Sequence, residues 1–372
     1  MLMLTSRDRL LRHFAGKPVD RFPIWLLFPW HRMGCYVDVW SNPCYQPIMK
    51  RVLAGDVDSF DRRSVNRGIA YNANPDIKIE HVVRQQGRNI VHEDIMHTPN
   101  GTFTKHISRG GDGAHVKFYV DDPEQLRDIM TIPYVPPKPD VELLRKERAE
   151  FGDNGLFMMD AGDPLSVLYE LMSAADFSMA TATDYDLLLE YLDCMESRVL
   201  DLYRYMLEND VADCYFIVGA EFAGPPLVSP TRFTELSVRY VKKICDLIHS
   251  YDKLSIVHYH GNLFHVREGM KQIGMDGLHT VEQPPIGDCT LTQAREVLGK
   301  NTALIGPVQY DDLIRLPGDA IEEQVKDAFR QAGDGKFILS PTAGPYEETI
   351  SEHSVSNFLR FIDAGLKYGK ME

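Results

Sequence analysis

The stretch LSIVHYHGNLFHVREGMKQIGMDGLHTVE, residues 254–282, contains the pattern that decides the fold. Two short apolar runs, 254–260 and 277–282, lie on either side of a stretch at 263–274 that has the spacing of an amphipathic helix. Apolar runs of this length that alternate with helices are typical of parallel strands joined by helical crossovers. The stretch therefore predicts one strand–helix–strand unit of an α/β protein.

The same alternation continues in both directions along the chain. Further apolar runs occur at 22–28, 156–160, 214–220, 302–308 and 336–341, and helix-like stretches occur at 184–209, 230–250, 289–299 and 318–332. We expect a single (β/α)8 TIM barrel that occupies residues 1–372 as one domain, because this series of units fits a closed barrel better than two domains. A doubly wound parallel sheet is the alternative.

Two regions lie outside this repeat. The first residues predict an N-terminal helical extension, with Thr5 or Ser6 as its N-cap and 16–18 as its end. Residues 60–120 contain stretches such as HVVRQQGRNIVHED that alternate apolar and polar side chains in the manner of hairpin strands. A β-rich insertion is therefore expected there.

Composition excludes several classes of function. Forty basic and 54 acidic residues give a net charge of −14, which disfavours binding to the phosphates of nucleic acids and to anionic membranes. No apolar stretch reaches the roughly 18 residues that a membrane span needs. The six Cys residues form no CxxC pair, which is typical of a reduced protein. These features predict a cytoplasmic protein with a small-molecule ligand.

Polar side chains stand where the predicted strands end, which is where a barrel carries its chemistry. His258 and His260 are two residues apart, so both point to the same side of one strand. Glu282 ends the next strand, and the three side chains together predict a zinc site with an open fourth position. Glu221, at the end of the preceding strand, is a further ligand or an acid/base. Hydrogen-bonded polar residues around an organic ligand are the alternative.

Other residues near these ends are candidates for catalysis and substrate binding. Asp160 is a candidate acid/base or a group that orients a metal ligand, whereas Asp163, which precedes a proline, is more simply a helix cap. Side chains that would contact a planar organic substrate are Trp25, Trp30, His31, Phe222, His279 and Tyr346. For each aromatic residue, packing in the core is the alternative.

Several ordered motifs together carry a family resemblance. They are SRDRLLRHFAGKPVDRFPIW at 6–25, MDAGDPLSVLYELM at 159–172, AEFAGPPLVSPTRF at 220–233, IVHYHGN at 256–262, MDGLHTVEQPPIGD at 275–288, LIGPVQYDDLI at 304–314 and FILSPTAGPYEETISEHS at 337–354. With these motifs the chain resembles the uroporphyrinogen decarboxylase superfamily over nearly its whole length. The resemblance implies a (β/α)8 barrel.

The superfamily contains decarboxylases of porphyrin precursors and methyltransferases that act with corrinoid proteins. The decarboxylases carry an Arg-rich segment soon after the first strand, where this chain has only Arg32. Glu221 occupies a position at which a carboxylate would repel a substrate with many carboxylates. The resemblance therefore disfavours porphyrinogen decarboxylation.

The resemblance to the methyltransferase branch concerns the metal site. Its members carry His-x-Cys at one strand end, and related synthases add a glutamate and a late cysteine. Here His258 matches the histidine, His260 replaces the cysteine and Glu282 matches the glutamate, whereas 340–344 (SPTAG) lacks the late cysteine. Without thiolates such a site is harder and more electrophilic, which suits polarising an ether oxygen.

The resulting hypothesis is a corrinoid-linked methyltransferase that acts as an O-demethylase. It would move a methyl group from a small methylated donor, a methoxylated aromatic being the first candidate, to the Co(I) of a separate corrinoid protein. Zinc would be the Lewis acid, and the resemblance also suggests a homodimer. The alternatives are a metal-independent decarboxylase and a non-catalytic binding barrel.

Overall fold

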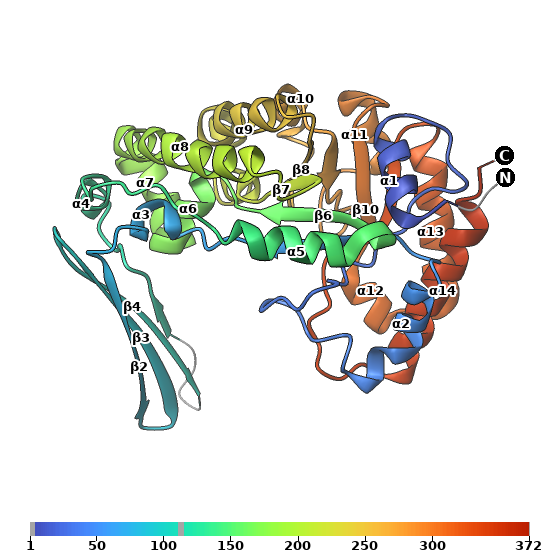
Figure 1. Ribbon diagram of the computed structural model, residues 1–372, viewed down its shortest axis with the longest axis horizontal. Coiled ribbons are helices and arrows are strands. Elements are labelled where there is room, and N and C mark those ends of the chain that lie inside the picture. The colour runs from blue at the N-terminus through green and yellow to red at the C-terminus, as the bar shows by residue number, and fades with distance from the viewer. Residues whose placement is uncertain (1–3, 111–114, 372) are drawn as a thin grey trace.

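The computed structural model describes residues 4–110 and 115–371 and contains a parallel sheet whose strands follow one another in chain order (Figure 1). Every neighbouring pair in this sheet is parallel. The strands are β1 (Ser59–Ser64), β6 (Gly155–Asp160), β7 (Cys214–Ile217), β8 (Leu254–His258), β9 (Gly277–His279), β10 (Ala303–Val308) and β11 (Phe337–Pro341).

A short eighth element closes the sheet. Ile24 bridges in parallel to Leu339 of β11, and Trp25 bridges to Asp58, directly before β1. The Trp25 N–H donates to the Leu339 carbonyl at 2.8 Å, and the Asp58 N–H donates to the Ile24 carbonyl at 2.6 Å. The edges of the sheet are thereby joined, so the predicted (β/α)8 barrel is confirmed and the doubly wound sheet is not.

The first predicted strand is shorter than its apolar run. The run 22–28 was expected to be extended throughout, but only two of its residues form bridges. Pro23 lacks an N–H to donate, and Leu27 has a φ of 63°, which turns the chain out of the extended conformation.

Helices connect the strands on the outside of the barrel, and several match their predicted ranges closely. The predicted helix at 184–209 is α8 (Tyr185–Glu208), whereas the one at 230–250 begins with a 3-10 turn and a π turn before α9. The other helices are α1 (Ser6–Phe14), α2 (Gln46–Leu53), α3 (Ile69–Asn72), α4 (Gln125–Met130), α5 (Val141–Phe151), α6 (Pro164–Leu171), α7 (Ala174–Thr183), α9 (Arg239–His249), α10 (Arg267–Ile273), α11 (Leu291–Leu298), α12 (Tyr310–Arg315), α13 (Gly318–Ala332) and α14 (Glu352–Tyr368).

The strands divide the apolar core into two parts. Leu156 and Met158 of β6 point into the barrel with Phe216 and Ile256, whereas Phe157 and Met159 belong to the layer between strands and helices. Leu10 and Phe14 of α1 join the inner part. The N-terminal helix therefore closes one end of the barrel, and the other end is left for chemistry.

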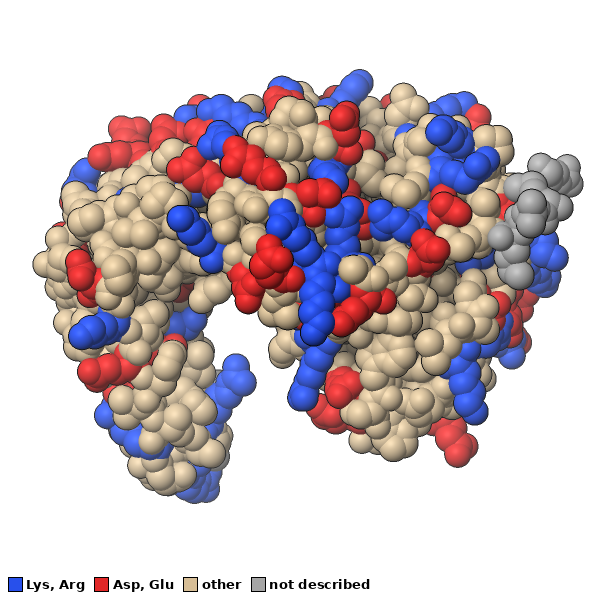
Figure 2. All heavy atoms as spheres, in the orientation of Figure 1, with Lys and Arg blue, Asp and Glu red and all other residues tan. Residues whose placement is uncertain are grey.

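The insertion is an antiparallel sheet that extends away from the barrel. In Figure 1 it forms an arm, and Figure 2 shows a deep notch between the arm and the body of the molecule. Its start differs from the expected residue 60, because β1 belongs to the barrel. The arm consists of β2 (Lys78–Gln86), β3 (Asn89–Thr98), β4 (Gly101–Gly110) and β5 (His115–Lys117).

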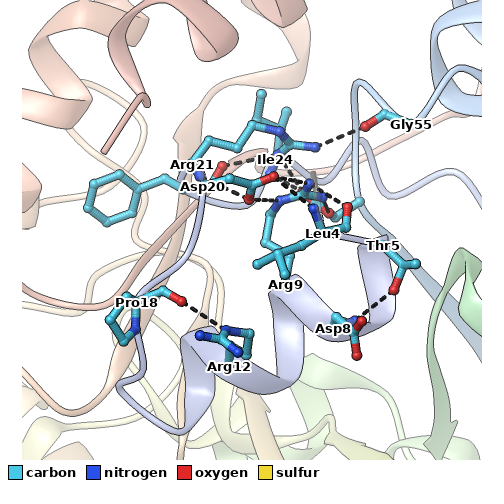
Figure 3. A network of polar contacts seen from close by, with 12 residues as sticks. Leu4, Thr5, Asp8, Arg9, Arg12, Pro18, Asp20, Arg21, Ile24 and Gly55 are labelled. Atoms are coloured by element: carbon cyan, nitrogen blue, oxygen red, sulfur yellow. Dashed lines mark hydrogen bonds and ion pairs between the residues drawn. The ribbon is translucent and has the colours of Figure 1, made fainter. Parts of the chain in front are cut away.

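A buried ion-pair network holds α1 against the barrel. Arg9 lies at the centre of the contacts in Figure 3 and donates to Asp20 at 2.7 Å and to Asp58 at 2.6 Å. The second oxygen of Asp58 accepts from Arg21 at 2.6 Å and from the Ile24 N–H at 3.0 Å. Asp58 thus connects the helix, the closing strand and the start of β1.

Within the described residues, none of the helices has the length and apolar character needed to cross a bilayer.

We predict that Asp58→Asn lowers the free energy of unfolding by about 3–5 kcal/mol, because Arg9 would remain buried with one partner charge removed. Urea unfolding measures the loss. Asp319→Asn is the matched control, since Asp319 is 94% exposed beside Arg360 and should cost under about 0.5 kcal/mol. A loss below about 1 kcal/mol for Asp58→Asn would contradict this role.

His13 supplies a pH-dependent contribution to stability. Its Nε2 accepts from the Phe337 N–H at 3.1 Å, and burial, with the charge of Lys336, lowers its pKa from 6.5 to about 4. The neutral form is therefore favoured in the fold, so stability is complete above pH 6.5 and is lost as pH falls towards 4. Between pH 7 and 5 we expect wild type to lose about 2 kcal/mol more than His13→Gln. Equal losses in denaturant unfolding would refute this.

Candidate functional site

Two histidines meet at the ends of β8 and β9. The strand register pairs His258 with His279, and their Nδ1 atoms lie 2.9 Å apart with the rings stacked at 5.0 Å. Burial, followed by the charge of His260, lowers the pKa of both groups well below 6.5. Both rings are therefore neutral at physiological pH, and one Nδ1 donates a proton that the other accepts.

A second pair lies beside them. His260 Nδ1 is 3.2 Å from Glu282 Oε1, and the other oxygen of Glu282 accepts from the Gly261 N–H at 2.7 Å. Burial acts to raise the pKa of Glu282, but the hydrogen bonds from His260 and Gly261 lower it below its usual value. Glu282 is therefore a carboxylate held in a fixed position.

The predicted metal ligands fit an ion in part. Two ligands on one tetrahedral zinc ion lie about 3.3 Å apart at the usual bond lengths, and the separation of His260 Nδ1 and Glu282 Oε1 is 3.2 Å. The His258 ring centroid is 4.5 Å from that of His260, but its Nδ1 is engaged by His279. Among residues 4–110 and 115–371, no three His, Cys, Asp or Glu side chains are gathered to hold one ion.

The three histidines, but not Glu282, line a cavity of about 220 Å³ at the mouth of the barrel. Tyr346 lines it as well, and its ring lies 5.9 Å from that of Tyr36. The full lining consists of Leu27, Cys35, Tyr36, Arg62, His258, His260, His279, Thr342, Ala343 and Tyr346. Of the sequence-predicted substrate contacts, His279 and Tyr346 lie here.

Arg62 of β1 is the cationic member of this lining. Its Nε donates to Asp160 Oδ2 at 3.2 Å, and its guanidinium lies 4.6 Å from the centre of the Phe216 ring. Asp160 is 1% exposed, and its other oxygen has no hydrogen-bond partner within the described chain. The candidate acid/base Asp160 is thus the counter-ion that fixes Arg62.

The carboxyl groups of Glu221 and Asp163 both lie close to Gly219. The Gly219 N–H donates to Glu221 at 3.0 Å, and a Cβ on Gly219 would lie 1.8 Å from Asp163 Oδ1. Burial raises the pKa of Glu221, and burial with the charge of Glu221 raises the pKa of Asp163 to about 7. Asp163 also caps α6 by accepting from the Ser166 N–H at 2.7 Å, as predicted.

The remaining predicted substrate contacts do not line this cavity. Trp25 is buried inside the barrel, with its ring 5.4 Å from that of His279. Trp30 packs on Phe151, and Phe222 stacks on Tyr169 at 3.6 Å. His31 Nδ1 is 2.5 Å from Asp61, which also accepts from two backbone N–H groups. The rings of Trp25, Trp30 and Phe222 are thus engaged in packing, and His31 is engaged by Asp61.

A larger cavity of about 640 Å³ adjoins the inner one and shares Cys35 and Arg62 with it. Four arginines line it, and sequence reasoning identified only Arg32 among them. The other three occur in RRSVNR at 62–67, at the end of β1. Three arginines within six residues could have indicated an anion-binding segment. They were missed because residues 60–120 were expected to form a β-rich insertion, and β1 was therefore not recognised as a strand of the barrel.

Comparison with known proteins assigns the chain to a family. The model of the uroporphyrinogen decarboxylase family matches residues 107–365, which is more than half of the chain. The chain belongs to the uroporphyrinogen decarboxylase family.

The chain is similar to one curated protein and to one solved structure over most of its length. Uroporphyrinogen decarboxylase 2, chloroplastic, of Arabidopsis thaliana is 22% identical over 346 residues, which cover 90% of this chain and 81% of the relative. A methyltransferase from Methanosarcina mazei is 20% identical, with a TM-score of 0.62 over 97% of this chain and 98% of the other. At this identity the second comparison establishes a shared fold.

In this uroporphyrinogen decarboxylase family member, we predict that Arg62→Met lowers the free energy of unfolding by about 3 kcal/mol, because Asp160 would remain buried without its main partner. The double variant Arg62→Met/Asp160→Asn should recover at least about 1 kcal/mol of that loss. Chemical denaturation of the four proteins gives the coupling. Additive effects would show that the ion pair is not a unit.

Proposed function

We propose that this uroporphyrinogen decarboxylase family member is a methyltransferase that removes a methyl group from a small methoxylated donor, with a methoxylated aromatic as the first candidate. The acceptor is the Co(I) of a separate corrinoid protein. The observation that carries the proposal is the His260–Glu282 pair, 3.2 Å apart, whose histidine lines a cavity of about 220 Å³ together with His258 and His279.

The size of the inner cavity supports a small reacting group. Pockets for drug-sized ligands typically measure roughly 300–1,000 Å³, whereas the inner cavity measures about 220 Å³. A methoxy group on a single ring suits that volume, and a tetrapyrrole does not.

The electrostatics support cleavage of a bond to oxygen. A divalent metal ion, zinc first, would be held by His260 and Glu282 with His258 beside them, and when bound it would supply Lewis acidity to the ether oxygen. The methyl–oxygen bond breaks with both electrons left on oxygen, the methyl group passes to Co(I), and the oxygen takes a proton.

Glu221 is the group we assign as proton donor. Burial raises the pKa of Glu221 above its usual value, which brings it towards the range of a proton donor, whereas the charge of nearby His260 lowers that pKa. His258 and His279, both neutral, add no charge to the cavity that they line.

The test is methyl transfer from methoxylated aromatics to a Co(I) corrinoid protein, followed through the visible spectrum of the corrinoid. We expect turnover with wild type that depends on added zinc and falls at least about 100-fold in His260→Ala and in Glu221→Gln. His81→Ala, in the exposed arm, is the control. Metal analysis should give one bound ion per chain in wild type and none in His258→Ala/His260→Ala.

Metal-independent decarboxylation is the second candidate, and the arginines of the larger cavity favour it because they suit a carboxylate substrate. Release of CO₂ by metal-free protein, with no methyl transfer, would replace the first proposal by this one. Tight binding of methoxyaromatics without either reaction would indicate a binding barrel.

A further inference from the structure

The larger cavity lies at the C-terminal ends of β1 and β6 and is closed on one side by α5. Ser64 and Asp160 mark the two strand ends in its lining, and Leu144 and Glu147 come from the helix. Because it shares Arg62 with the inner cavity, a ligand seated in it could extend towards the histidines.

The arginines of this cavity are not equivalent. Arg63 is bound by both oxygens of Glu147 at 2.6 and 2.7 Å, and Arg62 is bound by Asp160. Arg67 and the exposed Arg32, by contrast, make no side-chain hydrogen bond with any part of the described chain, and of these two only Arg67 is largely shielded from solvent. The carboxylate oxygens nearest to Arg67, on Asp160 and Glu170, are each 3.6 Å from its nitrogens. The Arg67 guanidinium therefore has two long ion pairs at this wall, and its five N–H donors make no hydrogen bond within the described chain.

Arg67 packs closely against the backbone of a neighbouring loop. Its Nε lies against Gly162 in the loop after β6, where an added Cβ would come within 3.0 Å of that atom and within 2.1 Å of Ser166 Oγ. Gly162 has a φ of +71°, so the shape of the loop favours glycine at this position. The Arg67 side chain is only 25% exposed, which strengthens an ion pair formed there.

The rest of the wall defines the ligand. Apolar side chains cover much of it, namely Met33, Val65, Ile69, Leu143, Leu144 and Met159. Four carboxylates, on Asp140, Glu147, Asp160 and Glu170, lie in the same lining as the four arginines. A ligand with one negative charge matches Arg67, whereas a polyanion would be repelled by the carboxylates around it.

We infer that the larger cavity binds the carboxylate of a singly charged, largely apolar organic acid, with Arg67 as its main ion-pair partner. The inference rests on the proposed function in one respect, namely that the bound acid is the methyl donor. The donor is in that case a methoxylated aromatic monocarboxylate. Its carboxylate lies at Arg67, its ring passes Arg62, and its methoxy group reaches the histidine cavity.

The experiment compares two probes of the same shape by calorimetry on the full chain, 4-methoxybenzoate and 4-methoxybenzamide. We expect the acid to bind wild type at least about tenfold more tightly than the amide, because only the acid forms a charged bidentate pair with Arg67. Arg67→Gln should remove that difference without weakening the amide, and Arg67→Lys should retain part of it. Arg84→Gln, in the arm, is the matched control.

Equal binding of acid and amide to wild type would overturn the inference, as would full affinity of Arg67→Gln for the acid. Tighter binding of benzene-1,3,5-tricarboxylate than of 4-methoxybenzoate would contradict the inference that the cavity prefers a ligand with a single negative charge. If Arg67→Gln fails to fold in a thermal unfolding control, the wild-type comparison still decides.

The binding measurement contains no corrinoid protein, so it is independent of methyl transfer. Selective binding of the acid without methyl transfer would uphold the anion site and refute the proposed function. Methyl transfer that proceeds equally well from 4-methoxybenzamide would do the reverse.

Discussion

The carboxylate of Asp58 is the contact on which the architecture depends. The strand that closes the barrel has only two bridging residues, so a long ladder of hydrogen bonds does not fix its position. Instead, Asp58 accepts from Arg9, from Arg21 and from the Ile24 N–H, and so joins α1 to both sides of the seam. Because the chain beyond this seam supplies Leu27 and Tyr36 to the inner cavity, closure of one end of the barrel shapes the site at the other.

Arg62 organises that site. It stands between the inner and the outer cavity, and its position is fixed by Asp160, by the Tyr36 hydroxyl at 3.2 Å and by the Phe216 ring. Because these contacts fix the guanidinium, its positive charge stays at one position between the two cavities. It divides the mouth into a compartment lined by histidines and one lined by arginines and carboxylates, so each compartment can contact a different part of one ligand.

The sequence predicts those parts of the fold in which the side-chain pattern is compatible with a single type of secondary structure. The strands β6, β8 and β11 are buried throughout or nearly so, and they were visible as apolar runs. β1 was not, because its upper half carries Arg62 and Arg63, whose ion pairs form only in the folded barrel. The strand-end rule brought His258, His260 and Glu282 to one place. The pairing of His258 with His279 depends on strand register, which no single segment encodes.

The arm has a consequence for the colloidal behaviour of the protein. Its strand β2 is almost wholly exposed and forms an edge of the sheet, with backbone groups unpaired on its outer side. Such an edge is a template for pairing with another chain. Lys78, Glu80 and Arg84 place charges of both signs along this edge, where a second strand would have to desolvate them. These charges therefore oppose edge-to-edge pairing of two arms.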